Sequence, residues 1–461
     1  MHTKEYRPYH PRQVLILPPS LQEWLPEDHL AYFIDDLVEH FDLHAIEEAY
    51  EDELRGGPPY HPAMMTKLLL YAYCTGVYSS RRIATHVHED VAFRVLAAGN
   101  APDFRTISEF RRRHLTTLSG LFRQVLELAQ RAGLVTMKHV ALDGTKVQAN
   151  ASKHKAMSYD RLCREESRLA AEVAEWFRRA EEIDAAEDAK YGPDRRGDEL
   201  PEELRRRESR LKRIREAKAA LEAEAKAKAE QQRAEQAAKA AQTAAEGRTP
   251  RPTKPPRETP EERTQYNFTD PESHIMKSGD GAFMQAYNAQ AAVDAEHQII
   301  VATTVTAQPA DAPHLEPMAA AIKETTGQSP ARLSADAGYF SEQAVTTLAP
   351  QIDLYIATEK VKHSQSVPSA PRGRIPTDLS VKDRMRRKLR TKAGRGVYRM
   401  RKAIVEPVFG QIKEARRFSR FLLRGVVKVR SEWSLVATAH NICRLFAARP
   451  RVKAVLRAAT G

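Results

Sequence analysis

Residues 156–245 divide the chain with a long run that is rich in Ala, Glu, Lys and Arg. Its large apolar residues recur at gaps of seven, four and three, at Leu162, Leu169, Val173, Trp176, Ala180 and Ile183. A break at residues 191–201 contains two glycines and two prolines, and a second apolar series follows at Leu204, Leu211, Ile214 and Leu221. Such heptad-like spacing predicts two helices that pair through one apolar seam, an antiparallel hairpin of coiled-coil character.

The apolar pattern weakens toward the end of the hairpin and is absent from the segment that follows it. Beyond Ala223 the seam loses its large residues, which predicts a frayed, solvated helix. The next segment carries prolines at positions 250, 252, 255, 256 and 260. Because proline fits neither a helix interior nor a central strand, this segment is expected to be an extended linker that ends near residue 263.

Strand signals lie on both sides of the hairpin. Before it, "HVALD" at residues 139–143 is short and apolar, and after it residues 283–294 and 297–307 have the spacing of an antiparallel strand pair. Further strands are expected at residues 331–336 and 353–358, with helices over residues 314–327 and 341–350. We therefore expect residues 136–155 and 264–450 to form one α/β domain, a mixed sheet flanked by helices, with residues 156–263 inserted into it and 451–461 as a basic tail.

The first 135 residues read as a set of short helices. In "DFRTISEFRRRHL", Thr106 and Glu109 have the spacing of a capping box, and the helix carries a cluster of arginines. The cluster consists of Arg105, Arg111, Arg112 and Arg113. Two short helices with a basic second one fit a helix-turn-helix unit that binds DNA, and they also fit an ordinary helical bundle with a solvated basic face.

Composition favours a soluble protein with a polyanionic partner. Lys and Arg total 73 against 61 Asp and Glu, a formal net charge of +12. Three scattered cysteines, Cys74, Cys163 and Cys443, form no CxxC pair, which excludes a cysteine-rich zinc site and suits a reducing cytoplasm. No run approaches the roughly 18 apolar residues that a membrane-spanning helix needs, so no membrane partner is expected.

Two aspartates end predicted strands. Asp143 closes "HVALD" and Asp336 closes "ARLSAD", and a glycine follows each within two residues. Ligands of α/β sheets bind at the carboxyl ends of strands, and two adjacent carboxylates repel each other unless cations compensate them. Mg²⁺ or Mn²⁺ is the fitting cation, although either aspartate alone could simply begin a turn. Asp294 is the rival second aspartate, but it precedes the turn "AEH", where a local role is expected.

A third carboxylate, Glu406, lies in a basic setting. The apolar residues Val405, Val408, Phe409 and Ile412 have helical spacing, and Pro407 disfavours helical geometry for the residue before it. We therefore expect a helix that begins at Pro407, with Glu406 at its positive end and Lys413 two turns further on.

Several other side chains have both a functional and a structural interpretation. The basic run at residues 383–402, which includes Arg387 and Arg390, could neutralise DNA phosphates or could be a disordered loop. Tyr339 and Trp433 could stack on bases, but aromatic residues near a sheet usually belong to the core. His86 and His88 lack the spacing of a zinc site and are interpreted as structural.

Three blocks together resemble the DDE transposases of bacterial insertion sequences. They are "LDGTKV", "SADAGYFS" and "YRMRKAIVEPVFGQIK". The resemblance implies a ribonuclease H-like catalytic domain with a helical insert after the first aspartate, and an N-terminal all-α DNA-binding domain. It makes Asp143, Asp336 and Glu406 the catalytic and metal-binding carboxylates for two Mg²⁺ ions, with Mn²⁺ as a substitute. Such a protein is expected in the bacterial cytoplasm, on the nucleoid when bound to DNA.

The resemblance also implies DNA-binding residues and partners. Lys413 has the family spacing from Glu406, whereas Tyr398 and Arg401 each stand one residue too far upstream. The expected partners are the terminal inverted repeats of the element, the target DNA and a second copy of the chain. The alternatives are a catalytically inactive descendant that only binds DNA, and a ribonuclease H-like nuclease that cuts by structure and never joins strands.

Overall fold

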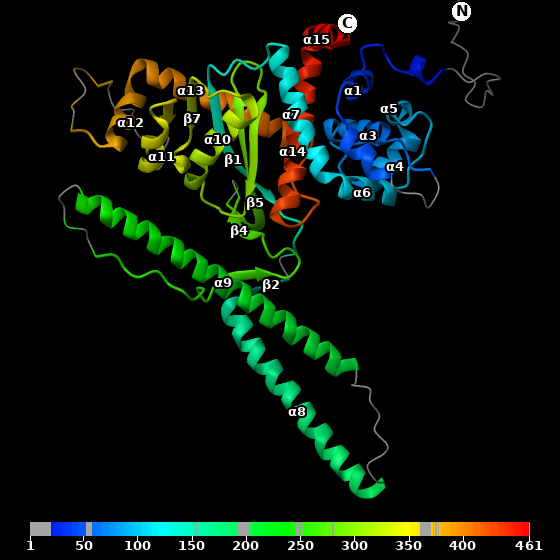
Figure 1. The fold of residues 1–461 in the computed structure, drawn as a ribbon, viewed down its shortest axis with the longest axis vertical. Coiled ribbons are helices and arrows are strands. Elements are labelled where there is room, and N and C mark those ends of the chain that lie inside the picture. The colour runs from blue at the N-terminus through cyan, green and yellow to red at the C-terminus, as the bar shows by residue number, and fades with distance from the viewer. Residues whose placement is uncertain are drawn as a thin grey trace, which may run out of the picture. The chain divides into compact units, whose positions relative to one another are not determined.

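The computed structural model describes residues 20–51, 58–152, 155–191, 202–245, 249, 252–278, 281–359, 370, 371, 373, 376 and 378–460 (Figure 1). It divides into two compact units. The first takes in residues 1–147, 288–423 and 427–461, and the second takes in residues 148–287 and 424–426. In the parts of the chain that the structure describes, no helix is long and apolar enough to cross a membrane.

The first unit is built on a mixed sheet. Its strands are β1 (Val140–Gln148), β5 (Phe283–Asp294), β6 (Ile300–Thr306), β7 (Arg332–Ala335) and β8 (Asp353–Ile356), and β5 and β1 continue into the second unit. The order is β5-β1-β7-β8, with β6 paired to β5. β7 runs parallel to both β1 and β8, whereas β5 and β6 form the expected antiparallel pair. The predicted mixed α/β sheet is thus confirmed.

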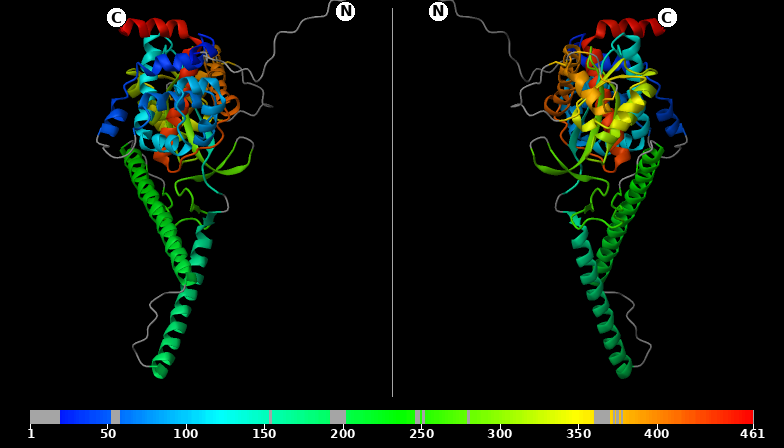
Figure 2. Two further views of the ribbon diagram at one scale, coloured as in Figure 1. Left: turned by 90° about the vertical axis from the view of Figure 1, so that its right-hand side faces the viewer. Right: turned by 90° about the vertical axis from the view of Figure 1, so that its left-hand side faces the viewer.

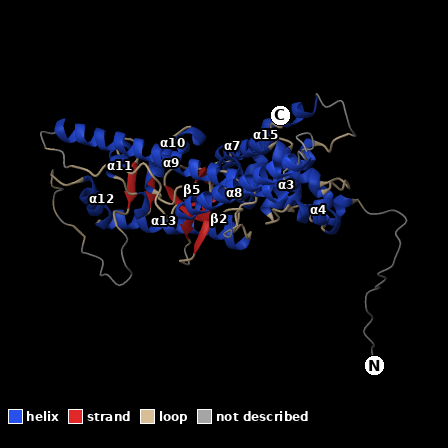
Figure 3. Ribbon diagram, turned by 90° about the horizontal axis from the view of Figure 1, so that it is seen from below, coloured by secondary structure: helices blue, strands red, loops and turns tan. Residues whose placement is uncertain are grey.

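Helices cover this sheet. They are α10 (Leu315–Thr326), α11 (Glu342–Leu348), α12 (Val381–Arg390), α13 (Lys392–Gly410) and α14 (Val426–Ala447). The last helix, α15 (Arg449–Thr460), packs against the N-terminal helices instead. In Figure 3 the strands lie between α10 and α13. α14 is anchored to the sheet by polar bonds: the Trp433 indole donates to the carbonyl of Gln290 (3.0 Å), and the Asn441 amide bonds both backbone groups of Ile300.

The structure settles two sequence interpretations of this region, one by burial and one by secondary structure. Trp433 and Tyr339 are fully buried, so both belong to the core and neither can stack on a DNA base. The basic run before Glu406 forms α12 and most of α13, so the disordered-loop interpretation was wrong. Ser380 and Thr391 cap these two helices by accepting backbone N–H groups, which explains how so charged a sequence begins helices here.

The N-terminal part of the first unit is helical, as predicted. It consists of η1 (Leu21–Trp24), α1 (Leu30–Val38), α2 (His44–Glu51), α3 (Pro62–Cys74), α4 (Ser80–Glu89), α5 (Val91–Leu96), α6 (Phe104–Arg113) and α7 (Leu115–Arg131). α7 reaches α14, where the Ser434 hydroxyl donates to the carbonyl of Ser119 (3.0 Å). His86 stacks on Phe93, which agrees with its structural interpretation.

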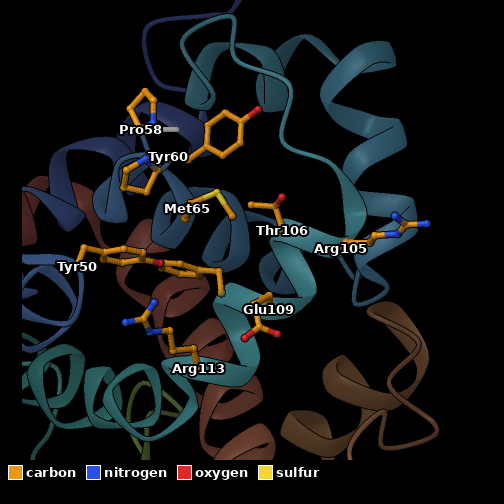
Figure 4. Close-up of a pocket in the computed structure, with 10 residues that line it drawn as sticks. Tyr50, Pro58, Tyr60, Met65, Arg105, Thr106, Glu109 and Arg113 are labelled. Atoms are coloured by element: carbon orange, nitrogen blue, oxygen red, sulfur yellow. The ribbon is translucent and has the colours of Figure 1, made fainter. Parts of the chain in front are cut away.

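The capping box expected at Thr106 and Glu109 was wrong. α6 begins one turn earlier, because the Asp103 carboxylate accepts the Arg105 N–H (2.8 Å) and caps the helix. Thr106 and Glu109 instead line a cavity of about 630 Å³ between α2, α3 and α6 (Figure 4). Tyr50, Tyr60 and Met65 form its apolar wall.

The second unit contains the predicted helical hairpin, α8 (Tyr159–Tyr191) and α9 (Glu202–Ala245), shown in Figure 2. Leu162, Leu169, Leu211, Ile214 and Leu221 form its buried core. At its base the short strands β2 (Ala156–Ser158) and β3 (Gln265–Asn267) pair, and β4 (His274–Lys277) pairs with the first residues of β5. The break at 192–201, the side chains of Ala180 and Ile183, and Pro250 lie outside the described residues.

Candidate active site

The register of two parallel strands places Asp143 and Asp336 side by side. In the paired stretch of β1 and β7, Val140 lies opposite Leu333 and Leu142 lies opposite Ala335. Asp143 and Asp336 are the next residues after Leu142 and Ala335. Both therefore lie at the carboxyl end of the paired stretch, which is where α/β sheets bind ligands. The prediction that β1 ends at Asp143 was wrong, because the strand continues to Gln148. Only its pairing with β7 ends there.

Asp143 is a mostly buried carboxylate that is held from two sides. One oxygen accepts the Gly144 N–H (2.9 Å), and the other pairs with the Arg401 guanidinium (3.0 Å). Burial and the charge of Asp336 together raise the pKa of Asp143 to about 6, against the lowering effect of Arg401. The Asp336 carboxylate accepts the Gly338 N–H (2.8 Å) and caps the short helix η4 (Ala337–Tyr339).

α13 supplies the cationic side of the site. Arg401 is buried on this helix, and Tyr398 lies one turn before it with its ring centroid 5.9 Å from the guanidinium carbon. Burial raises the pKa of Tyr398, so its hydroxyl stays protonated. The structure therefore brings two of the residues with shifted spacing, Tyr398 and Arg401, next to Asp143.

A fourth acidic residue, Asp311, lies in sequence between Asp143 and Asp336, and sequence reasoning missed it. One of its oxygens accepts the Asn288 amide (2.6 Å), the Gln290 amide (3.0 Å) and the Lys146 ammonium (3.3 Å). The Tyr339 hydroxyl donates to the other end of the Gln290 side chain. Burial raises the pKa of Tyr339, which keeps that hydroxyl a donor. We call these five side chains the polar platform.

The platform explains both glycines of the aspartate motifs. A Cβ atom on Gly144 would lie 2.4 Å from the Gln290 amide nitrogen and 3.0 Å from an oxygen of Asp311. A Cβ atom on Gly338 would lie 3.2 Å from the other Asp311 oxygen. These distances are shorter than ordinary contacts, so the chain after each aspartate passes directly over the platform. A signal was present, because Asn288 and Gln290 are polar residues in a largely apolar strand, and buried polar residues need partners.

Glu406 lies on α13 one turn beyond Arg401, with an exposed side chain. The helix start expected at Pro407 was wrong, because α13 runs through Pro407 to Gly410 and then continues as a π-helix, η5 (Gln411–Ala415). Proline cannot donate to the carbonyl of Ala403, and the Gln298 side-chain amide takes that place (3.2 Å). Within the described ranges, no three acidic, histidine or cysteine side chains are grouped closely enough to hold a metal ion.

Lys413 reaches back to β1. Its ammonium donates to the carbonyl of Lys146 (2.9 Å), three residues after Asp143, and burial lowers its pKa. Asp294, the rival aspartate, is fully buried and accepts the Glu296 N–H (3.1 Å), which is the local turn role expected of it. It also accepts the N–H of Met137 (2.9 Å), a residue far away in the sequence, so its role extends beyond the turn.

The other predicted DNA-binding residues differ in accessibility. Arg111 is a correction: it is buried and donates to the carbonyl of Tyr78 (2.8 Å) and the hydroxyl of Ser80 (3.3 Å), so it cannot reach DNA. Its position four residues after Ile107, on the apolar face of α6, was the available signal.

The remaining arginines stay predictions. Arg105 is exposed, Arg112 is exposed and bonds Glu109, and Arg390 is half-buried on α12. Arg387, also half-buried on α12, donates to the carbonyl of Gly373 (2.8 Å).

Two protein-family models match the chain. A transposase domain family (DUF772) matches residues 19–113, and a transposase DDE domain matches residues 249–442. The chain belongs to the DDE transposases of insertion sequences. No curated protein and no solved structure matches it. Asp336, Glu406 and Lys413 of the transposase fall inside the DDE match, whereas Asp143 lies between the two matched ranges.

Membership of this family has three general implications for the transposase. Its DDE domain implies a ribonuclease H-like fold, in agreement with the mixed sheet and its helices. The family consists of polynucleotidyl transferase-type enzymes that act on DNA. Its members generally use divalent metal ions.

Proposed function

We propose that the transposase binds the ends of its insertion sequence, cuts DNA strands by metal-activated hydrolysis and joins the freed 3′-hydroxyl groups to target DNA. The observation that carries the proposal is the register that sets Asp143 beside Asp336 at the carboxyl end of paired parallel strands. In this proposal the N-terminal helices bind DNA, and residues 136–155 and 264–450 form the catalytic domain around the inserted hairpin.

The carboxylates suit a divalent cation. Burial and the neighbouring charge of Asp336 both raise the pKa of Asp143, which is the electrostatic strain that a bound cation relieves. Asp143, Asp336 and Glu406 would hold the metal, for which hard oxygen ligands favour Mg²⁺, two ions in this scheme, with Mn²⁺ as a substitute. A bound divalent ion supplies an activated oxygen nucleophile and stabilises the charge that develops at phosphorus.

The protein's own residues position the DNA. Arg401 neutralises Asp143 in the free protein, and we infer that it transfers to a phosphate flanking the cut site when a cation takes its place beside Asp143. Lys413, held near β1 by the carbonyl of Lys146, would contact a phosphate on the other side. Tyr398 would orient Arg401 through its ring face.

Glu406 would complete the site when DNA binds. It is exposed about one turn before the π-helix, and π-helical turns that follow or interrupt α-helices are frequent at functional sites. The proposal therefore includes a local change of α13 that brings Glu406 toward Asp143.

A nicking assay tests the function. Purified transposase is incubated with supercoiled DNA carrying the element ends, with and without Mg²⁺. Asp143→Asn, Asp336→Asn and Glu406→Gln are each expected to lower strand cleavage by at least about a thousandfold, the order expected when charge stabilisation at the reacting centre is lost. Their affinity for the DNA ends should change little. Glu414→Gln, which alters an exposed carboxylate on η5, is the matched control and should cut normally.

The outcomes separate the candidate functions. Wild-type cleavage by any of the three variants would refute the site assignment. DNA binding without cleavage by the wild-type protein would identify an inactive descendant, and cleavage without joining would identify a nuclease. The proposal also includes a dimer on paired DNA ends, and sedimentation that shows one protein chain on paired ends would contradict it.

A further inference from the structure

A second polar cavity lies where the N-terminal helices meet the chain after the π-helix, entirely within the first unit. Its volume is about 420 Å³. One wall is the turn from α3 to α4, with Gly76, Tyr78, Ser79 and Arg82. The other wall is the segment that follows Lys413, and its lining residues include Arg416, Arg417, Ser419 and Arg420.

The lining of this cavity is strongly cationic. Four arginines line it, and none of its lining residues in the described part of the chain is acidic. Three of them, Arg82, Arg417 and Arg420, are exposed, so their charges face solvent at the cavity. A concave surface with charges of one sign concentrates an electric field that attracts ions of the opposite sign.

Arg416 is the observation that points to a ligand. Its side chain is only 9% exposed, and it forms no ion pair with a carboxylate among the described residues. One guanidinium nitrogen contacts the His440 ring (3.1 Å), and its Nε has no hydrogen-bond partner. Burial lowers the pKa of His440 to about 3, so this neighbour is neutral and cannot share the charge. The Cys443 thiol also hydrogen-bonds this guanidinium, and a hydrogen bond with Cys74 together with the charge of Arg416 lowers its pKa to about 7. A buried guanidinium beside a neutral ring and a partly ionised thiol is incompletely compensated, and a bound anion reduces that cost.

The start of α4 adds backbone donors to the same cavity. Ser79 occupies the N-cap position of this ten-residue helix, and its hydroxyl makes no capping bond. The first N–H groups of a helix have no partner within the helix, and they favour negative charge through the helix dipole. Helix N-termini of this kind bind phosphate groups.

The turn from α3 to α4 and the segment after Lys413 are in close backbone contact. Gly76 has φ +79°, and a Cβ atom there would lie 2.6 Å from the carbonyl oxygen of Arg416. Arg417, the next residue, has φ +59°, in the left-handed region that non-glycine residues rarely adopt. The arginines and the start of α4 therefore line one cavity.

We propose that this cavity binds one backbone phosphate of the DNA that the transposase holds, and so ties the N-terminal helices and the catalytic chain to the same duplex. The inference rests on the proposed function for the identity of the ligand as DNA. It adds a specific anion site, several residues beyond Lys413, that contacts the backbone and reads no base. Its loss should weaken binding by a similar factor on all sequences.

Ser79→Asp is the decisive variant, because its two expected effects have opposite signs. Aspartate is an excellent N-cap, so the thermal stability of the full chain should stay the same or rise. The same carboxylate occupies the anion site, so the affinity for a 40-base-pair duplex should fall at least about tenfold, the scale of one charge-assisted contact. The slope of log affinity against log salt should fall by about one. Arg420→Gln should weaken binding in the same direction, whereas Arg451→Gln, an exposed arginine on α15, is the matched control.

A methylphosphonate scan of the duplex identifies the contact. Neutralising one phosphate should weaken binding by the wild-type protein and have no further effect on Ser79→Asp. Wild-type affinity in both Ser79→Asp and Arg420→Gln would overturn the proposal, and if Ser79→Asp proves unstable, Arg420→Gln alone decides. Stabilisation of the wild-type protein by inorganic phosphate, with unchanged DNA binding in the variants, would show a free-anion site and would also overturn it.

The test is separable from that of the proposed function. Cleavage by the wild-type protein together with normal DNA binding by both variants refutes the phosphate site alone. A wild-type protein that does not cut, but binds DNA in a way that depends on Ser79, refutes the transposase mechanism alone.

Discussion

Gly144 offers the sharpest test of the polar platform. A Cβ atom at this position would meet the Gln290 amide nitrogen at 2.4 Å, an oxygen of Asn288 at 2.9 Å and an oxygen of Asp311 at 3.0 Å. Ordinary contacts begin at about 3.4 Å, so the nearest overlap is about 1 Å. Gln290 is fully buried and cannot turn away without breaking its bonds to Asp311 and Tyr339. The methyl group therefore has no free space.

The magnitude follows from these contacts. Overpacking of a buried site costs about 1–3 kcal/mol, and each broken hydrogen bond adds about 1 kcal/mol. Gly144→Ala is therefore expected to lower the free energy of unfolding by about 2–4 kcal/mol and to displace Asp143. A displacement of 1 Å at a catalytic group costs about a hundredfold in rate, so strand cleavage should fall by at least that factor.

Urea unfolding and the nicking assay measure the two effects. Gly120→Ala is the control, because Gly120 lies on α7 with nothing within 4 Å of the added carbon, and that change should be neutral or slightly stabilising. The double variant Gly144→Ala, Gln290→Ala removes the closest atom and should recover part of the cleavage activity. If Gly144→Ala alone is as stable and active as the wild-type protein, the close approach of the platform is refuted.

Two further predictions concern buried polar side chains. Arg111→Met removes donors to the Tyr78 carbonyl and the Ser80 hydroxyl and should cost about 2–3 kcal/mol of stability, whereas Arg112→Met should stay within about 0.5 kcal/mol; equal urea midpoints would contradict this assignment. Burial lowers the pKa of His440 to about 3, so the unfolded chain binds a proton that the folded chain excludes as the pH falls below about 6.5. Stability should therefore drop by about 2 kcal/mol from this group between pH 7 and 5, and His440→Gln should flatten that part of the urea-unfolding profile; an unchanged slope would contradict it.

Periodicity was sufficient to predict the elements that carry the site. The apolar run at 139–142 and the turn residues around 295–298 predicted β1 and the β5–β6 pair, because strand burial and turn chemistry are local properties. The adjacency of Asp143 and Asp336 also followed, since parallel strands expose their carboxyl ends at one edge. The error at β1 has the same origin. Sequence shows where apolar residues stop, whereas β1 continues after its pairing with β7 has ended.

The platform could not be predicted in the same way. Asp311 lies within the short segment "PADAP" (residues 309–313), and its partners come from β5 and β1, which only the folded sheet brings together. The predicted helix start at Pro407 was wrong for a similar reason. Local propensity ends a helix before proline, but a side chain 109 positions earlier in the sequence supplies the missing donor.

The bond between Gln298 and the carbonyl of Ala403 has a consequence for how this chain can vary. Gln298 has φ +55°, a conformation that disfavours most side chains, and its amide is the donor that lets α13 pass through Pro407. Gln298 and Pro407 are therefore expected to vary together. Homologues with proline at this point of the helix should keep an amide at the strand turn, and homologues that lose the proline should be free to place glycine or asparagine there.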